Sequence, residues 1–356
     1  MAGSLRYTTA TRGTPDGGGH QTGKFMGHVI AISNLKGGIG KTTTVVNVGA
    51  GLALKGARVL LVDVDAQGNL AMALGIQPRR TLYEVLVDGA RAADCITAAR
   101  PNLDLLPSDH TLLGAQPVIA QRPDWSRALE KALHPLFGSY DFILIDSGGS
   151  LTPLNVNAFV CASSVIAPTT IEHFSLKSID LLFSQVARVK GGSGSIKLIV
   201  PTMFDPRVKQ SAELLDDLRE RYGALVGPPI RVNVRLSEAP RHGQTIYEFD
   251  PRSRGAVDYA LLVERLCELF PFEAPPAAPT RRPATDGRPA PIVNGRTASS
   301  RHTEADERPI AVAAPTVQTC PNCGHAVNHA ALAGYDVTYC NNCRWTSQKL
   351  ARTMRR

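Results

Sequence analysis

The sequence lacks any long apolar segment. No run in its 356 residues approaches the roughly 18 continuous apolar residues that a membrane-spanning helix needs. The N-terminal residues also lack the apolar core of a secretory signal peptide. We therefore expect a cytoplasmic protein with no membrane among its partners.

Cysteine and aromatic residues are also scarce. Four of the seven cysteines are grouped near the C-terminus, while Cys95, Cys161 and Cys267 are scattered, which is unlike the disulfide framework of a small secreted protein. Aromatic residues make up 6% of the chain, but a hydrophobic content of 43% still allows a full core over part of its length. The formal net charge of +8 favours polyanionic partners, without distinguishing DNA from RNA or anionic lipid.

Apolar runs alternate with helical patterns from residue 28 to residue 270. The runs at residues 58–63, 142–146, 164–167 and 196–200 are nearly continuous, as expected of strands buried on both faces of a parallel sheet. Segments such as 124–137 and 209–222 have helical spacing. This order predicts a doubly wound α/β domain with a mostly parallel sheet. Residues 1–27 and the Pro-, Ala- and Arg-rich residues 271–319 lack such patterns, so we expect a disordered N-terminal segment and a flexible linker.

A phosphate-binding loop follows the first apolar run. Residues 29–33 are typical of a strand and residues 42–54 of a helix, and the segment between them is rich in glycine. Such glycines let backbone N–H groups turn toward phosphate oxygens at the positive end of the helix. The Lys41 amine would reach the β/γ-phosphates of a nucleotide, and the Thr42 hydroxyl would bind Mg²⁺. The predicted nucleotide-binding residues of this P-loop are Gly37, Gly38, Ile39, Gly40, Lys41, Thr42 and Thr43.

Carboxylates lie at the ends of two predicted strands. Asp63 and Asp65 follow one apolar run, and Asp146 ends another. Doubly wound sheets place ligand-contacting groups at such strand ends, next to the P-loop. Asp146 fits a Walker B carboxylate that holds Mg²⁺ directly or through water. The alternative for Asp63 and Asp65 is that they cap the next helix.

Two Cys-x₂-Cys pairs near the C-terminus predict a metal site. Cys320 and Cys323 form one pair, Cys340 and Cys343 form the other, and 16 residues separate them. Each pair can aim two thiolates at one tetrahedral Zn²⁺, so we expect residues 320–356 to form a zinc-ribbon-like module with structural zinc. A redox dithiol pair and an iron site with the same ligands are the alternatives. Such a small module needs its metal to fold.

The P-loop resembles the deviant Walker A motif of the ParA/MinD family of dimerising ATPases. In that family an additional lysine, here Lys36, contacts the nucleotide of the partner subunit; the alternative is a solvated loop lysine. Residues 62–69 resemble the Asp-x-Asp-Pro-Gln-Gly-Asn motif of ParA and Soj-type proteins, with Ala66 in place of proline. This resemblance implies that Asp65 orients the attacking water and that Asp63 supports the Mg²⁺ shell. The relatives usually have Thr-Pro-Pro-Ser where residues 147–150 read Ser-Gly-Gly-Ser.

Three further segments, 202–207, 233–240 and 248–251, also resemble chromosomal ParA sequences. The resemblance implies adenine-side contacts from Met203, Asn233 and Pro240. It also implies sequence-independent DNA contacts from basic residues, here Arg207, Lys209, Arg231, Arg235 and Arg241. Contacts to phosphate alone predict strong salt dependence and little sequence preference. The alternative is an ordinary solvated surface of mixed charge.

The resemblance as a whole implies a P-loop ATPase that uses ATP and Mg²⁺ and forms a nucleotide-dependent homodimer. The ATP-bound dimer would bind nonspecific double-stranded DNA on the nucleoid. A ParB-type activator would stimulate hydrolysis, and the cycle would segregate chromosome or plasmid DNA.

Three other functions remain open at this point. The same ATPase could position a non-DNA cargo such as an organelle, a chemoreceptor cluster or a flagellar apparatus, or it could gate a zinc-ribbon regulator. An iron–sulfur reductase related to nitrogenase iron protein would need cluster-binding cysteines in the core, where Cys95 and Cys161 lack a supporting motif. Membrane targeting of the MinD type is disfavoured, because the C-terminal residues do not form an apolar helical stripe.

Overall fold

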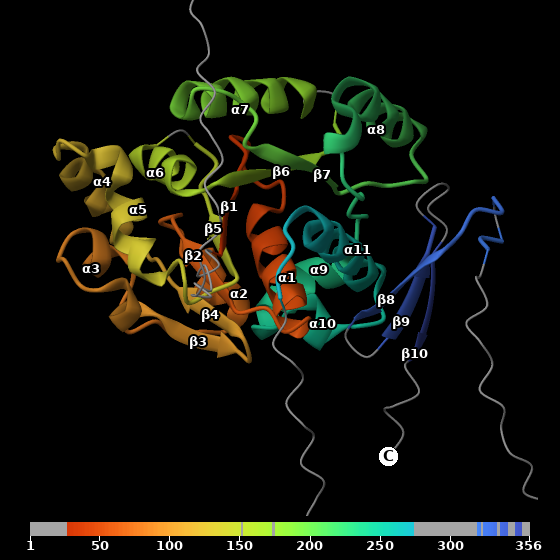
Figure 1. The fold of residues 1–356 in the computed structure, drawn as a ribbon, viewed down its shortest axis with the longest axis horizontal. Helices are drawn as coiled ribbons and strands as arrows, with labels where there is room; N and C mark the ends of the chain where they lie inside the picture. The colour runs from red at the N-terminus through yellow and green to blue at the C-terminus, as the bar shows by residue number, and fades with distance from the viewer. Residues whose placement is uncertain are drawn as a thin grey trace, which may run out of the picture.

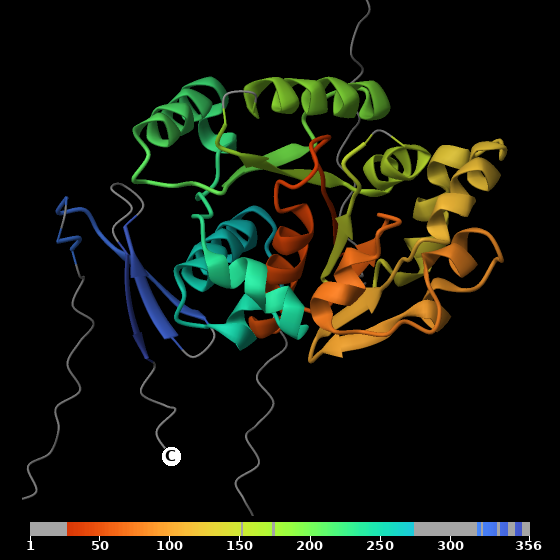
Figure 2. The same ribbon diagram turned by 180° about the vertical axis from the view of Figure 1, so that it is seen from behind.

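The computed structural model of the chain describes residues 27–150, 152–172, 175–273, 319–321, 323–332, 335–340 and 346–350. Almost all of the predicted disordered N-terminal segment and of the predicted linker lies outside the described residues, as does Cys343. Figures 1 and 2 show the arrangement of the described helices and strands from opposite sides.

A seven-stranded sheet forms the centre of residues 27–273, in the order β3-β4-β2-β5-β1-β6-β7. Strand β3 pairs antiparallel with β4, and the other neighbouring pairs are parallel. The prediction of a doubly wound, mostly parallel sheet is therefore confirmed. The strands are β1 (His28–Ile32), β2 (Val59–Asp63), β3 (Thr97–Arg100), β4 (Leu103–Leu106), β5 (Phe142–Asp146), β6 (Ser164–Thr170) and β7 (Ile196–Thr202).

Helices cover both faces of this sheet, because successive residues of each strand point to opposite faces. In β1, Val29 and Ala31 belong to one apolar core, and Ile30 and Ile32 belong to the other. The first core is closed by α3 (Leu82–Leu86), α4 (Leu112–Ala120), α5 (Ala128–Leu133), α6 (Pro153–Cys161), α7 (Ser175–Lys190) and α8 (Lys209–Tyr222). The second is closed by α1 (Lys41–Leu54), α2 (Asn69–Leu74), α10 (Ile246–Phe249) and α11 (Arg254–Leu269). Both views show α7 and α1 on opposite sides of the sheet.

The predicted helix at residues 124–137 is broken into three short pieces. Helix α5 is flanked by 3₁₀ turns at Trp125–Arg127 and His134–Leu136. The buried side chain of Asn157 explains the first break, since it accepts from the Leu129 N–H at 3.0 Å and donates to the Trp125 carbonyl at 2.9 Å. The second turn contains Pro135, which has no N–H to continue the helix. Helix α8, by contrast, has the predicted bounds.

The C-terminal described residues form a separate three-stranded antiparallel sheet in the order β10-β9-β8. Its strands are β8 (Asn328–Leu332), β9 (Tyr335–Tyr339) and β10 (Thr346–Leu350). Within the described ranges, no helix is both long and apolar enough to cross a membrane.

Candidate nucleotide-binding site

The P-loop connects β1 to α1 and has the backbone conformation that its glycines predict. Gly38 and Gly40 have positive φ angles of 71° and 84°, which glycine adopts without the steric cost that a Cβ would add. The Thr202 hydroxyl at the end of β7 donates to the Ile39 carbonyl at 2.9 Å and so holds the loop against the sheet. All seven predicted P-loop residues line one cavity of about 640 Å³.

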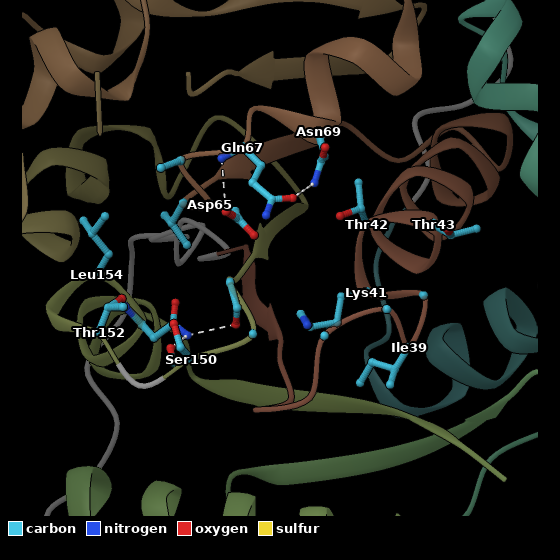
Figure 3. Close-up of a pocket in the computed structure, with 18 of the residues that line it drawn as sticks. Ile39, Lys41, Thr42, Thr43, Asp65, Gln67, Asn69, Ser150, Thr152 and Leu154 are labelled. Atoms are coloured by element: carbon cyan, nitrogen blue, oxygen red, sulfur yellow. Dashed lines mark hydrogen bonds between the residues drawn. The ribbon is translucent and has the colours of Figure 1, made fainter. Parts of the chain in front are cut away.

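Lys41 is buried at the first position of α1 and points into this cavity (Figure 3). Its Nζ donates to the Lys36 carbonyl at 2.9 Å, so the side chain is folded back along the loop. Burial lowers the pKa of Lys41, while the nearby carboxylates of Asp146 and Asp65 oppose that shift. A buried ammonium beside an open cavity is well suited to bind phosphate oxygens.

Thr42 lines the cavity and contacts Asp146, which is not among the described residues that line it. The Thr42 hydroxyl donates to Asp146 Oδ2 at 2.7 Å, and the second oxygen, Oδ1, is buried without a hydrogen-bond partner among the described residues. Burial, and secondarily the neighbouring Asp63, raises the pKa of Asp146. An unsatisfied carboxylate oxygen beside a threonine hydroxyl fits the oxygen-ligand preference of Mg²⁺.

Asp63 lies one strand away from Asp146 and braces the following loop. The two residues are direct partners across the β2–β5 pair. The Asp63 carboxylate is fully buried and accepts from the backbone N–H groups of Asp65 and Leu70 at 3.0 and 3.1 Å. Burial raises its pKa to about 7. Asp63 therefore holds the loop that carries Asp65, and its support of a Mg²⁺ shell stays a prediction.

Asp65 lines the cavity with a half-buried carboxylate, across from Lys41 (Figure 3). The Gln67 N–H donates to Asp65 Oδ1 at 3.1 Å, and the Ser108 hydroxyl donates to the Asp65 carbonyl. The first contact holds the carboxylate and the second holds the Asp65 backbone, at the edge of the cavity. Ser108 was not predicted from the sequence, because it comes from a different segment of the chain.

The Gly148–Ser150 segment forms another part of the cavity wall. Asn155 in α6 donates from Nδ2 to the carbonyls of Gly148, at 2.9 Å, and of Ser150. A Cβ at Gly149 would lie 3.2 Å from the Gly37 nitrogen, so this segment packs directly against the P-loop backbone. Glycine at 149 permits a closer approach than the proline of the resembling sequences, which carries a Cβ.

Lys36 turns away from the cavity of its own chain. Its Nζ lies 2.6 Å from Glu172 Oε2 and donates to the Thr170 hydroxyl at 3.3 Å. Lys36 is absent from the described residues that line the cavity, and its side chain is 36% exposed. Thr170 and Glu172 were not predicted from the sequence. Their place just after an apolar strand run is the signal that would have indicated them.

The predicted adenine-side residues do not all reach the same space. Met203, with a positive φ of 53°, lines the P-loop cavity. Pro240 lines a neighbouring cavity of about 160 Å³, which shares Thr42 and Thr43 with the first. Asn233 lines neither of these two cavities; it caps α9 (Val234–Glu238) by accepting from the Arg235 N–H.

Four of the predicted DNA-binding cations are exposed. Arg207 and Lys209 are 84% and 91% exposed and pair with Asp205 and Glu213, at 2.7 and 3.4 Å. The segments that carry Arg207 and Arg235 lie side by side, because the Val232 N–H donates to the Phe204 carbonyl at 3.0 Å.

Arg235 lies in the second of these segments, and Arg241 lies where that segment continues. The Arg235 guanidinium is 54% exposed and contacts Glu238 at 2.9 Å and Asp250 at 3.4 Å. Arg241 is also exposed, in the 3₁₀ turn Ala239–His242.

Arg231 differs from the other four cations in its surroundings. Its guanidinium forms a forked ion pair with Asp258, with a shortest distance of 2.6 Å, and the Asp258 side chain is only 4% exposed. This pair with a buried carboxylate ties Arg231 to α11, and its contact with DNA phosphate stays a prediction.

The sequence of the chain is similar to those of several known proteins. The family model of the AAA domain matches residues 27–196. The chain is 39% identical over 249 residues to the sporulation initiation inhibitor protein Soj of Bacillus subtilis, covering 68% of this chain and 98% of Soj. It is 38% identical over 248 residues to the chromosome partitioning protein ParA of Caulobacter vibrioides, covering 67% of this chain and 93% of ParA.

Two solved structures with bound nucleotide analogues share the fold. A putative plasmid partition protein of Borrelia burgdorferi bound to AMPPNP is 26% identical, with a TM-score of 0.60, and the match covers 68% of this chain and 99% of that one. A cobyrinic acid a,c-diamide synthase of Mycobacterium smegmatis with bound ATP analogue and magnesium is 29% identical, with a TM-score of 0.59, covering 70% and 98%. With the identity to Soj and ParA over almost their whole lengths, these findings show that the chain belongs to the ParA/Soj family of partition ATPases.

Proposed function

We propose that this chain is an ATP-dependent dimerising ATPase that segregates chromosome or plasmid DNA. The observation that carries the proposal is the single cavity in which the P-loop, Thr42 and Asp65 meet. The P-loop N–H groups and the Lys41 ammonium would hold the β- and γ-phosphates of ATP. The Thr42 hydroxyl and the unsatisfied Asp146 oxygen would hold Mg²⁺, which neutralises charge on those phosphates.

Asp65 would orient the water that attacks the γ-phosphate. Its carboxylate is fixed at the cavity edge by the Gln67 N–H. A carboxylate at hydrogen-bond distance from the attacking water acts as a general base or as a positioning group. Asp63 would hold this loop in place by accepting hydrogen bonds from the N–H groups of Asp65 and Leu70.

Dimerisation would bring Lys36 to the nucleotide of the partner subunit. Two facts support this proposal: the Lys36 amine lies outside its own cavity, and it is held by an exposed ion pair with Glu172 that is weak enough to exchange. A second cation at the transferred phosphoryl group offsets the charge that develops during hydrolysis, as an arginine finger does.

The ATP-bound dimer would bind double-stranded DNA without sequence preference through Arg207, Lys209, Arg235 and Arg241. Their exposure supports contact with backbone phosphates, which needs cations and no base-reading geometry. A ParB-type activator would then stimulate hydrolysis and release the dimer from the nucleoid.

Light scattering of the full chain tests the dimer. We expect Asp65→Asn with Mg²⁺ and ATP to run as a dimer, and to return to a monomer with ADP. Lys36→Ala in the same background should remain a monomer, whereas Lys131→Ala, which removes an exposed paired lysine in α5, should still dimerise. A chain that stays monomeric with ATP in every variant would contradict the proposal.

A further inference from the structure

Three cysteines outside the nucleotide site converge at the start of the C-terminal sheet. The sulfur atoms of Cys320, Cys323 and Cys340 all lie within 4.8 Å of one another. Those of Cys323 and Cys340 are 3.5 Å apart, although 16 residues separate them in the chain. Cys320 and Cys340 are buried, and Cys323 is partly buried. Three thiols therefore share one small, largely enclosed space.

The backbone around the first pair is a closed turn that aims both thiols to one side. The Gly324 N–H donates to the Cys320 carbonyl at 2.9 Å, with Gly324 at a positive φ of 72°. The Cys320 N–H donates to the His325 carbonyl at 2.8 Å, and Thr319 and Ala326 form an antiparallel bridge. The turn is thus fixed by its own backbone hydrogen bonds.

The second part of the cluster is placed by the sheet. Cys340 follows β9 directly, and β9 is the central strand, paired with β8 on one side and β10 on the other. The register sets Tyr339 opposite Asn328 and Thr346. The position of Cys340 is therefore determined by pairing on both edges of β9, independently of the turn that carries Cys320 and Cys323.

The sulfur separations fit a shared metal ion better than a disulfide. A disulfide requires about 2.05 Å between its two sulfur atoms and uses only two of them. Four thiolates about 2.3 Å from one tetrahedral Zn²⁺ lie about 3.8 Å from each other. The separation of 3.5 Å between Cys323 and Cys340, and the limit of 4.8 Å for all three pairs, fit the second arrangement.

We propose that Cys320, Cys323 and Cys340 hold a structural Zn²⁺ that folds the C-terminal sheet as a module separate from the ATPase domain. Three thiolates leave one tetrahedral position; Cys343, the fourth ligand predicted from the sequence, lies outside the described residues. Cys320 and Cys340 are buried, and such enclosure by protein thiolates is typical of a structural site. Three short strands cannot bury enough surface to fold alone, so metal binding supplies the missing free energy.

Metal analysis of the full chain, purified under reducing conditions, tests this proposal. We expect about one zinc per chain, and a loss of most of it in Cys320→Ser and Cys340→Ser. The matched control is Cys267→Ser, a partly buried cysteine of α11 far from the cluster in sequence, which should keep its zinc. Nucleotide binding should be unchanged in all three variants, so failure here is distinguishable from failure of the ATPase proposal.

Cobalt substitution tests the ligand set directly. Co²⁺ should give the intense visible bands of a tetrahedral thiolate site, and Cys→Ser changes at Cys320, Cys323 and Cys340 should each weaken the sulfur charge-transfer band. His325→Ala, which removes a ring that contacts the Cys323 carbonyl at 3.1 Å, should leave that band unchanged. Iron in place of zinc, or metal-free protein with a Cys323–Cys340 disulfide under the same conditions, would overturn the proposal.

Discussion

The amine of Lys36 lies 2.6 Å from Glu172 Oε2 of the same chain, just beyond the end of β6. This contact orders Lys36 beside the cavity without placing it on the nucleotide of its own subunit. Lys36, which we propose contacts the nucleotide of the partner subunit, is thus paired with Glu172 within its own chain. In the proposed dimer, the partner's nucleotide and Glu172 would compete for one ammonium group.

Glu172→Gln should therefore favour the dimer. The change removes the competing charge, and an exposed ion pair of this kind is worth at most about a fivefold change in an equilibrium. We expect a twofold to fivefold lower protein concentration, roughly, at half-dimerisation with ATP, measured by analytical ultracentrifugation. Glu213→Gln breaks a comparable exposed pair in α8 and should have no effect. Weaker dimerisation of Glu172→Gln would show that Glu172 supports the dimer.

The free energy of unfolding without nucleotide should fall as the pH rises toward neutrality. Burial raises the pKa of Asp63 to about 7 and also raises that of Asp146, so the folded chain retains protons that the unfolded chain releases near pH 4. This contribution is complete below pH 4 and is lost as the pH passes about 7, with a limiting slope of about 1.4 kcal/mol per pH unit for one proton. Between pH 5 and 8, urea unfolding should show a smaller decrease in the free energy of unfolding for Asp63→Asn than for the parent chain. An identical pH slope in the two proteins would contradict this origin.

Gly149→Ala should weaken nucleotide binding. Its new methyl group would lie 3.2 Å from the Gly37 nitrogen, so either the P-loop or the Gly148–Ser150 segment must move. Overpacking of this kind costs about 1–2 kcal/mol, or roughly 5- to 30-fold in the dissociation constant. Gly148→Ala is the matched control, because its nearest neighbour would be Asp65 Oδ2 at an ordinary 3.6 Å. Titration with a fluorescent ATP analogue measures both variants, and equal affinities would show that the close approach is unimportant.

Arg231→Ala should destabilise the fold. The change leaves the buried Asp258 carboxylate without its cation, and breaking a buried pair in this way costs about 3 kcal/mol. Urea denaturation should detect that loss. Arg265→Ala, which breaks a more exposed pair in α11, should stay within about 0.5 kcal/mol of the parent chain. If Arg231→Ala stays stable but binds DNA more weakly, Arg231 contacts DNA as the sequence predicts.

Local signals were sufficient to predict five of the seven strands and the position of the P-loop, whereas β3 and β4 were not predicted. Apolar runs marked those five strands, and Lys41, Thr42 and Asp146 each lie at a strand or helix end that such runs define. The spacing of glycine and lysine then specified the phosphate-binding chemistry. These features depend on neighbours in sequence, so the sequence alone could indicate them.

The remaining contacts depend on residues that are distant in sequence. Lys36 meets Glu172, and Arg231 meets Asp258, only after the sheet and α11 have formed. The break in the predicted helix 124–137 has the same kind of cause, since Asn157 captures its backbone groups from another helix. A helical pattern contains no information about such a partner.

Binding to random-sequence duplex DNA tests the central claim most directly. The full chain should bind with Mg²⁺ and ATP, release with ADP or without nucleotide, and weaken steeply with salt. Lys36→Ala should lose binding by failing to dimerise, and Arg235→Ala by losing phosphate contact. Arg91→Ala, which breaks an exposed pair of the same i,i+3 spacing, should bind normally. Binding that ignores the nucleotide and survives both Lys36→Ala and Arg235→Ala would contradict a nucleotide-gated DNA clamp.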